Sequence, residues 1–233
     1  MALFKGSIVA EISGAVNGIV FSRNRGGAYV RNRSVPVNPS TDQQTRIRSI
    51  FGGNASAWKA LPDTVRENWR LYAEKTPLIN RLGASRPIPA LAMYQRCITP
   101  RVQASLSIPA DAPTTPGLPN PFVFAAGGVT ADEAEQEVTI NFTTGQAWAS
   151  QVGAAALFYL SVGQSPAVNN PGSTFRYIGR TLGAATPPTS PTVLNVADVQ
   201  PIAGDLRYWL RVVVTDAEGR LSQEVIQELA SVS

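Results

Sequence analysis

The stretch YWLRVVV, residues 208–214, decides the fold of the C-terminal half. Apolar residues occupy every second position, which is the period of a β-strand that buries one face. The turn-forming residues 216–219 (DAEG) follow, and residues 223–229 then have the composition of a last strand. The sequence therefore predicts a hairpin whose first strand contributes four side chains to a core. These are Tyr208, Leu210, Val212 and Val214.

Residues 122–233 repeat this pattern of short alternating segments between turn clusters. Six or seven such strands in about 110 residues are typical of a β-sandwich. The Cys…Trp…Cys pattern of antibody domains is missing, and the terminal strand, turn and strand resemble the penultimate hairpin of a fibronectin type III module. The expected strands are 137–143, 155–162, 175–182, 192–196, 207–215 and 223–229.

A proline-rich segment and a helical region precede these strands. Residues 106–121 contain five prolines, which predicts an extended linker. Residues 41–105 predict three helices: one that begins at Ser40 or Thr41, one from Pro62 to before Pro77, and one over 90–98 that ends at Pro100. Their apolar spacing predicts a small bundle. The residues expected in its core are Ile47, Phe51, Trp58, Trp69 and Tyr72.

The first 40 residues predict a basic extended arm. Residues 19–23 and 28–33 flank Asn24-Arg25-Gly26-Gly27, a turn in which glycines supply positive φ, so we expect a β-hairpin. Residues 12–41 contain no acidic side chain. The residues expected to bind a partner from this arm are Arg23, Arg25, Tyr29, Arg31 and Arg33.

The fold class predicted for the whole chain is α+β in two modules. The N-terminal module combines the hairpin arm (1–40) with the helices (41–105), and the linker (106–121) joins it to an immunoglobulin- or fibronectin type III-like sandwich (122–233). The charge divides in the same way, because residues 1–110 contain 15 Lys or Arg and 5 Asp or Glu, and residues 111–233 contain 5 and 11. Such opposite signs indicate modules with different partners.

Composition restricts the chemistry. The chain has no histidine, which removes Ser-His-Asp and Cys-His catalysis, histidine metal ligands and the imidazole base. Its one cysteine, Cys97, permits no internal disulfide and suits a reducing cytoplasm. No membrane-spanning run, secretory signal, phosphate loop or dinucleotide fingerprint is present. We expect no cofactor, no metal, no catalytic residue and no membrane partner.

The N-terminal sequence also resembles a known group of proteins. The string SGAVNGIVFSRNRGGAYVRNRSVPVNPST, residues 13–41, is followed by Gln43-Gln44, Ala57-Trp58, Asn68-Trp69 and Tyr72-Ala73. Over about the first 100 residues it resembles a family encoded in the structural-gene regions of tailed phages and prophages. That family has no established activity to carry over. The resemblance implies a virion component that is made in the cytoplasm of a bacterial host.

The arginine-rich arm has three interpretations. It docks on an acidic protein surface, it binds nucleic-acid phosphates, or it forms a solvated face or pairs within an oligomer. We rank protein docking first, because the arm's aromatic residues are only Phe4, Phe21 and Tyr29 and no nucleic-acid motif accompanies them. The expected partners are capsid, portal, collar or tail proteins and further copies of the chain, with nucleic acid ranked below them.

The carboxylates at the start of the C-terminal half have two interpretations. Asp132, Glu133, Glu135 and Glu137 could include a hydrolytic pair, although a solvated turn is the more ordinary arrangement. We therefore predict a non-enzymatic virion structural protein, in a capsid decoration or cement role. A head–tail junction or tail protein is the alternative within the virion, and a nucleic-acid-binding protein is the alternative of another class.

Overall fold

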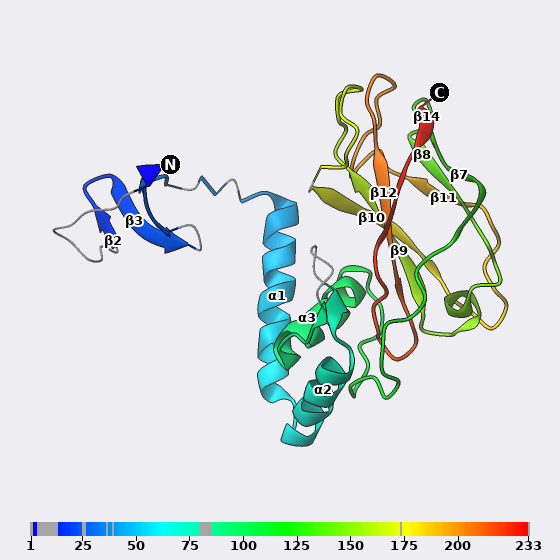
Figure 1. The fold of residues 1–233 in the computed structure, drawn as a ribbon. Coiled ribbons are helices and arrows are strands. Elements are labelled where there is room, and N and C mark those ends of the chain that lie inside the picture. Colours follow the sequence, from blue (N-terminus) through cyan, green and yellow to red (C-terminus); the bar gives the residue numbers. More distant parts are fainter. Residues whose placement is uncertain are drawn as a thin grey trace. The chain divides into compact units, whose positions relative to one another are not determined.

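The computed structural model describes residues 2–3, 14–24, 27–35, 37–38, 40–79, 85–172 and 174–232. These residues contain three α-helices and antiparallel sheets, so the fold is mixed α+β (Figure 1). The backbone contacts divide the chain into two compact units, Met1–Thr45 and Arg46–Ser233. The second unit contains both the helices and the sheets of the C-terminal half.

The first unit is one antiparallel sheet with the strand order β1-β4-β3-β2. The expected hairpin is present, since Ile19 pairs with Asn32 and Asn24 pairs with Gly27. A tighter turn joins β2 to β3, where Asn17 and Gly18 both have positive φ. The strands are β1 (Ala2–Leu3), β2 (Gly14–Val16), β3 (Ile19–Asn24) and β4 (Gly27–Asn32).

The helices are α1 (Asp42–Ala60), α2 (Asp63–Lys75) and α3 (Ala90–Gln103). The predicted end of α3 at Pro100 is not found, because the helix continues through this proline. Proline removes one helical N–H and costs about 3 kcal/mol in a helix interior. Arg101 and Gln103 lie beyond it and are both buried, so tertiary contacts of the last turn offset that cost. A two-residue ladder, β5 (Leu78–Ile79) with β6 (Ser85–Arg86), lies between α2 and α3 in the chain.

Two four-stranded sheets make up the rest of the second unit. One has the order β10-β9-β12-β13 and the other β11-β8-β7-β14, in which β14 runs parallel to β7. The six expected strands are present, and β7 and β14 are additional. The bounds are β7 (Phe124–Asp132), β8 (Glu137–Phe142), β9 (Ala155–Ser161), β10 (Phe175–Leu182), β11 (Thr192–Asn195), β12 (Trp209–Thr215), β13 (Val225–Glu228) and β14 (Ala230–Val232), with a 3₁₀ turn at Ala147–Ser150.

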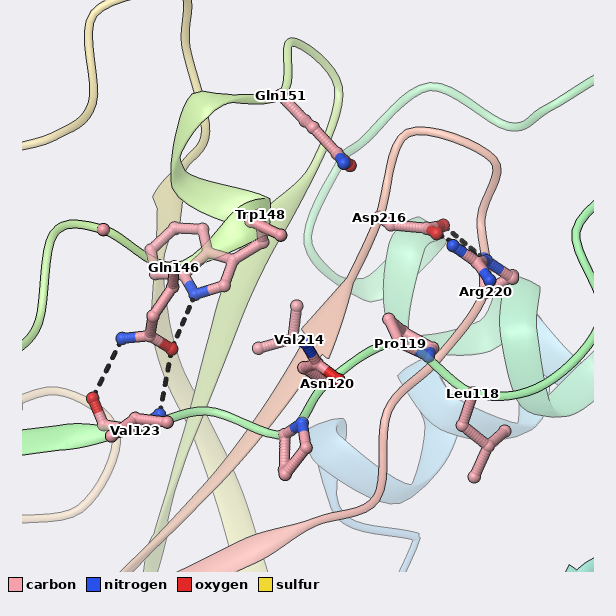
Figure 2. A pocket seen from close by; sticks show the side chains of 13 residues that line it. Leu118, Pro119, Asn120, Val123, Gln146, Trp148, Gln151, Val214, Asp216 and Arg220 are labelled. Atoms are coloured by element: carbon pink, nitrogen blue, oxygen red, sulfur yellow. Dashed lines mark hydrogen bonds and ion pairs between the residues drawn. The ribbon is translucent and has the colours of Figure 1, made fainter.

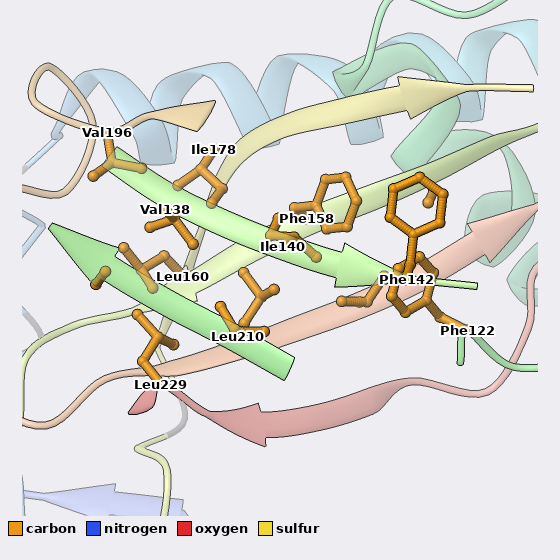
Figure 3. Close-up of a cluster of buried hydrophobic side chains, with 14 of the residues drawn as sticks. Phe122, Val138, Ile140, Phe142, Phe158, Leu160, Ile178, Val196, Leu210 and Leu229 are labelled. Carbon is orange, nitrogen blue, oxygen red and sulfur yellow. The ribbon is translucent and has the colours of Figure 1, made fainter. Parts of the chain in front are cut away.

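The two sheets enclose an apolar core (Figure 3). Val138 and Ile140 of β8 contribute to it from one sheet, and Phe158 and Leu160 of β9 from the other. All four side chains expected from residues 208–214 are in this cluster, as alternation along a strand requires. They are Tyr208, Leu210, Val212 and Val214.

A second apolar cluster joins the helices to the outer face of the β10-β9-β12-β13 sheet. It contains Trp69 of α2 and Met93 of α3 together with Leu157 of β9 and Val213 of β12. Strands β9 and β12 therefore have buried residues on both faces. The helices and this sheet share a hydrophobic core within one compact unit, rather than forming modules at opposite ends of a free linker.

The segment expected to be a linker packs along this junction. Ala112 is buried in the second cluster, and the Gly117 N–H donates to the Thr76 hydroxyl at 3.0 Å. On the sheet side, the hydroxyls of Thr114 and Thr115 donate to Glu218 at 2.9 and 3.1 Å. The prolines thus hold an extended path that is bonded to the helices and to the turn after β12.

Candidate functional site

The N-terminal sheet carries two of the expected basic residues on its exposed surface. Arg31 and Arg33 are exposed, and Tyr29 is half-buried. Val20 pairs with Arg31, whereas position 23 pairs with Ala28. Because residues alternate between the faces of a strand, positions 29 and 31 share one face and position 23 belongs to the other. Arg25 lies outside the described residues. The expected arginines do not all occupy one face.

The face that contains position 23 is otherwise mainly apolar. Phe21 pairs with Val30, and Val16 pairs with Ile19. Val16 is 65% exposed and Ile19 42% exposed, although both are large hydrophobic side chains. Among residues 14–22, 29–35, 37–38 and 40–45, no side chain is buried. Stable domains normally bury a sheet face against a second layer. One face of this sheet therefore carries Val16, Ile19, Phe21 and Val30 together with position 23, and we call it the apolar face. The opposite face carries Val20, Tyr29 and Arg31, and we call it the basic face.

The helical residues expected in a core divide into two groups. Trp69 and Tyr72 are buried, and Trp58 packs against the same cluster. Ile47 is half-buried, but Phe51 is 44% exposed, which corrects its placement in the core. The face of α1 that points inward contains the buried Asn54, whose amide donates to the Thr99 hydroxyl at 3.1 Å. The side of α1 that carries Asn54 therefore faces the rest of the unit, and Phe51 lies beside that contact face.

Two arginines that the sequence analysis did not single out hold the helices to the sheet. Arg101 is 1% exposed, and its guanidinium donates four hydrogen bonds to neutral oxygens. Burial lowers its pKa, while the nearby Asp216 charge opposes that shift. Arg96 donates to the carbonyls of Leu221 and Ser222 at 2.9 and 3.0 Å, beside the point where the chain leaves β12. Arginine's planar fork suits such multiple contacts.

A cavity of about 590 Å³ lies beside this junction (Figure 2). Residues 118–121, the 3₁₀ turn and the end of β12 line it. The Gln146 amide spans its wall, because Gln146 accepts from the Val123 N–H at 2.9 Å and from the Trp148 indole at 3.1 Å. Across the cavity the Arg220 Nε donates to Asp216 at 2.6 Å. These polar groups are already hydrogen-bonded within the protein, so their role in this structure is to hold the cavity wall in place.

The described titratable groups do not converge on a reactive centre. No group of three or more His, Cys, Asp or Glu that could hold a metal ion occurs among the described residues. Cys97 is buried, and this burial raises the pKa of its thiol to about 11. A thiol with that pKa is almost entirely protonated at neutral pH and is a weak nucleophile.

Acidic side chains gather at one end of the two-sheet structure. This end comprises the turn between β7 and β8 and the connection from β11 to β12, which are bonded to each other. Gln136 donates to the Ile202 carbonyl at 2.9 Å and accepts from the Ile202 N–H at 2.8 Å. Among the described residues, no ion pair involves its carboxylates. We name this the acidic end, and its members are Asp132, Glu133, Glu135, Glu137, Asp198 and Asp205.

Comparison with known proteins finds no match to a protein family, to a curated protein or to a solved structure. Within the described ranges, no helix combines the length and the apolar character required to cross a bilayer. The interpretation of function therefore depends on the surfaces described above: the open sheet of residues 1–45, the cavity beside residues 118–121 and the acidic end.

Proposed function

We propose that the chain is a non-enzymatic structural protein of a tailed-phage particle. The observation that carries the proposal is the N-terminal sheet, a separate unit in which no side chain of residues 14–22 and 29–35 is buried. A single-layer sheet with exposed Val16 and Ile19 gains stability when another surface covers it. The resemblance of residues 13–41 to phage structural-region proteins supports a virion surface as that partner.

We further propose that the two-sheet structure is a fibronectin type III-like domain. In chain order its sheets contain strands β7, β8 and β11 on one side and β9, β10, β12 and β13 on the other, an arrangement typical of that fold. Tyr208 at the start of β12 supports this, because its hydroxyl accepts from the Ala203 N–H at 3.0 Å and donates to the Pro201 carbonyl at 3.3 Å. A tyrosine bonded to upstream backbone at this corner is a feature of such sandwiches.

In this proposal the N-terminal unit and the helices dock on the particle, and the acidic two-sheet structure projects from it. We favour a capsid decoration or cement role, with a head–tail junction or tail protein as the alternative position. The measurement that tests the proposal is quantitative mass spectrometry of purified, nuclease-treated particles. Hundreds of copies per particle support the capsid role, and about a dozen support a symmetric position at the unique vertex or tail. No copies would refute the proposal.

One feature favours a second candidate, a nucleic-acid-binding protein. Tyr29 and Arg31 share one face of the N-terminal sheet, and an aromatic ring beside a cation on a sheet is a surface on which single-stranded bases stack. This candidate predicts DNA or RNA binding whose affinity falls steeply with salt and is lost in the Arg31→Ala, Arg33→Ala chain. Salt-independent or unchanged binding in that variant would exclude it.

A further inference from the structure

The N-terminal sheet has two faces, and one docked surface covers only one of them. Its apolar face contains Val16 and Ile19, whereas Tyr29 and Arg31 lie on the opposite face. The exposed Arg33 follows directly after β4. If the apolar face packs on the particle, as proposed above, the basic face remains free to bind an acidic partner.

The acidic end offers a complementary surface on the same polypeptide. The carboxylates of Glu133, Glu135, Asp198 and Asp205 are on exposed residues. Half-exposed valines lie in the same region, with Val193 at 48% exposure and Val199 at 36%. The cation Arg176 is also present, and it donates to the Val199 carbonyl at 2.8 Å. The surface therefore combines an excess of negative charge with apolar area.

Local structure holds these carboxylates at the surface. A side chain added at Gly204 would meet Glu133 Oε2 at 2.5 Å, so the Glu133 carboxylate lies directly over the connection from β11 to β12. Asp132 accepts from the Glu135 N–H at 3.0 Å, and Asn195 donates to the Glu135 carbonyl at 3.4 Å. The two loops are thus bonded into one rigid end, and rigidity lowers the entropic cost of binding.

We propose that the basic face of the N-terminal sheet of one copy docks on the acidic end of a second copy. The contact is head-to-tail, because the two surfaces are different parts of the chain, and it generates a ring or a row of copies. This inference rests on the proposed function only for its place on the particle. Because it is measured with the purified chain, it can fail while particle association is confirmed, and the reverse also holds.

Charge reversal tests the pairing of the two surfaces. One chain carries Arg31→Glu with Arg33→Glu, and another carries Glu133→Arg with Glu135→Arg. Sedimentation velocity over a concentration series compares them with the unchanged chain at about 0.1 M and about 1 M salt, where the Debye length is about 10 Å and about 3 Å. We expect the unchanged chain to self-associate at low salt, and each variant to weaken association about tenfold or more.

If the contact is head-to-tail, two further experiments restore the opposite charges of the paired surfaces. An equal mixture of the two variants regains association, because both surfaces of one variant are then acidic and both surfaces of the other are basic. A chain that carries both reversals regains association, because the reversed surfaces again have opposite charge. The matched control for the Arg31→Glu, Arg33→Glu chain is Lys59→Glu with Lys75→Glu, which makes the same charge change at exposed helix positions and leaves association unchanged.

Three results would overturn the inference. The first is that the unchanged chain remains a monomer at every concentration. A sheet that docks on the acidic end of its own chain would give this result and would also overturn the inference. The doubly reversed chain fails to associate although its circular dichroism spectrum shows that it is folded. The control variant loses association to the same extent as the two reversed chains.

Discussion

Arg101 offers the sharpest test of how the helices and sheets are joined. Its guanidinium donates to Thr215 Oγ1 and the Asp216 carbonyl at 2.9 Å each, both within the interior. It also donates to the carbonyls of Ser107 and Gly153 at 2.8 and 3.1 Å, in partly buried positions that water can reach. The perturbation is Arg101→Met, which keeps much of the aliphatic volume and removes all four donors.

The magnitude follows from the two interior acceptors. Each buried acceptor left without a donor costs about 1–3 kcal/mol, which gives about 2–6 kcal/mol for Thr215 and Asp216 together. Arg101→Met also removes a buried charge, and avoiding its desolvation offsets part of this free-energy cost. The desolvation of Arg101 is visible in its pKa, which burial lowers. We therefore expect Arg101→Met to lower the free energy of unfolding by about 2–4 kcal/mol. The control Arg70→Met removes an exposed ion pair with Glu67 and costs about 0.5 kcal/mol.

The assay is urea unfolding followed by tryptophan fluorescence. Trp58 and Trp69 report on the helices, and Trp148 and Trp209 on the sheets. A shared core predicts one cooperative transition for both sets, and Arg101→Met should move its midpoint to lower urea. A loss below about 1 kcal/mol, or equal to that of the Arg70 control, would refute the role assigned to this guanidinium.

Four other predictions follow from named contacts. Gly52→Ala and Gly53→Ala should each raise the unfolding free energy by about 0.5–1 kcal/mol in urea titrations, because both lie within α1 and an added Cβ meets nothing within 4 Å. Gly183→Ala should lower it instead, since its Cβ would lie 2.1 Å from the Trp148 carbonyl oxygen, and a neutral result would contradict this packing. Burial raises the pKa of Glu218, but hydrogen bonds from Thr114 and Thr115 outweigh it and leave this pKa below its ordinary value. Its stabilising contribution is therefore present at neutral pH and is lost as the pH falls from the ordinary pKa of glutamate, about 4.3, through the lower pKa of Glu218. The melting temperature of Glu218→Gln should therefore fall less on acidification than that of the unchanged chain. Cys97 should react with a thiol reagent at pH 8 only after urea unfolding, and rapid labelling of the folded chain would show that its burial is wrong.

Short-range pattern was enough to predict most of the elements. Alternation in residues 208–214 predicted which side chains of β12 enter the core between the sheets, because strand periodicity acts locally. The Asn24–Gly27 turn predicted the N-terminal hairpin for the same reason. The end of α3 was predicted wrongly at Pro100, since the burial of Arg101 depends on strands more than a hundred residues away.

The site predictions were limited by register and by rotation about a helix. Glycines and arginines predicted a basic hairpin, but only strand pairing shows that positions 23 and 31 belong to opposite faces. Apolar spacing placed Phe51 in a core, whereas the inward face of α1 is set by Asn54 and its bond to Thr99. A polar anchor of this kind has no signature in a hydrophobic pattern.

The sequence by itself determined the α+β class, the hairpin at each end and the opposite charges of the two halves, because these depend on local periodicity and composition. It also held an unused signal: residues 155–161 (AALFYLS) and 208–214 are nearly continuous apolar runs, which indicates strands covered on both faces. Only the tertiary structure decided what covers them. The helices, Arg101 and the segment 106–121 meet the outer face of β9 and β12 through contacts distant in sequence, and no local pattern specifies such partners.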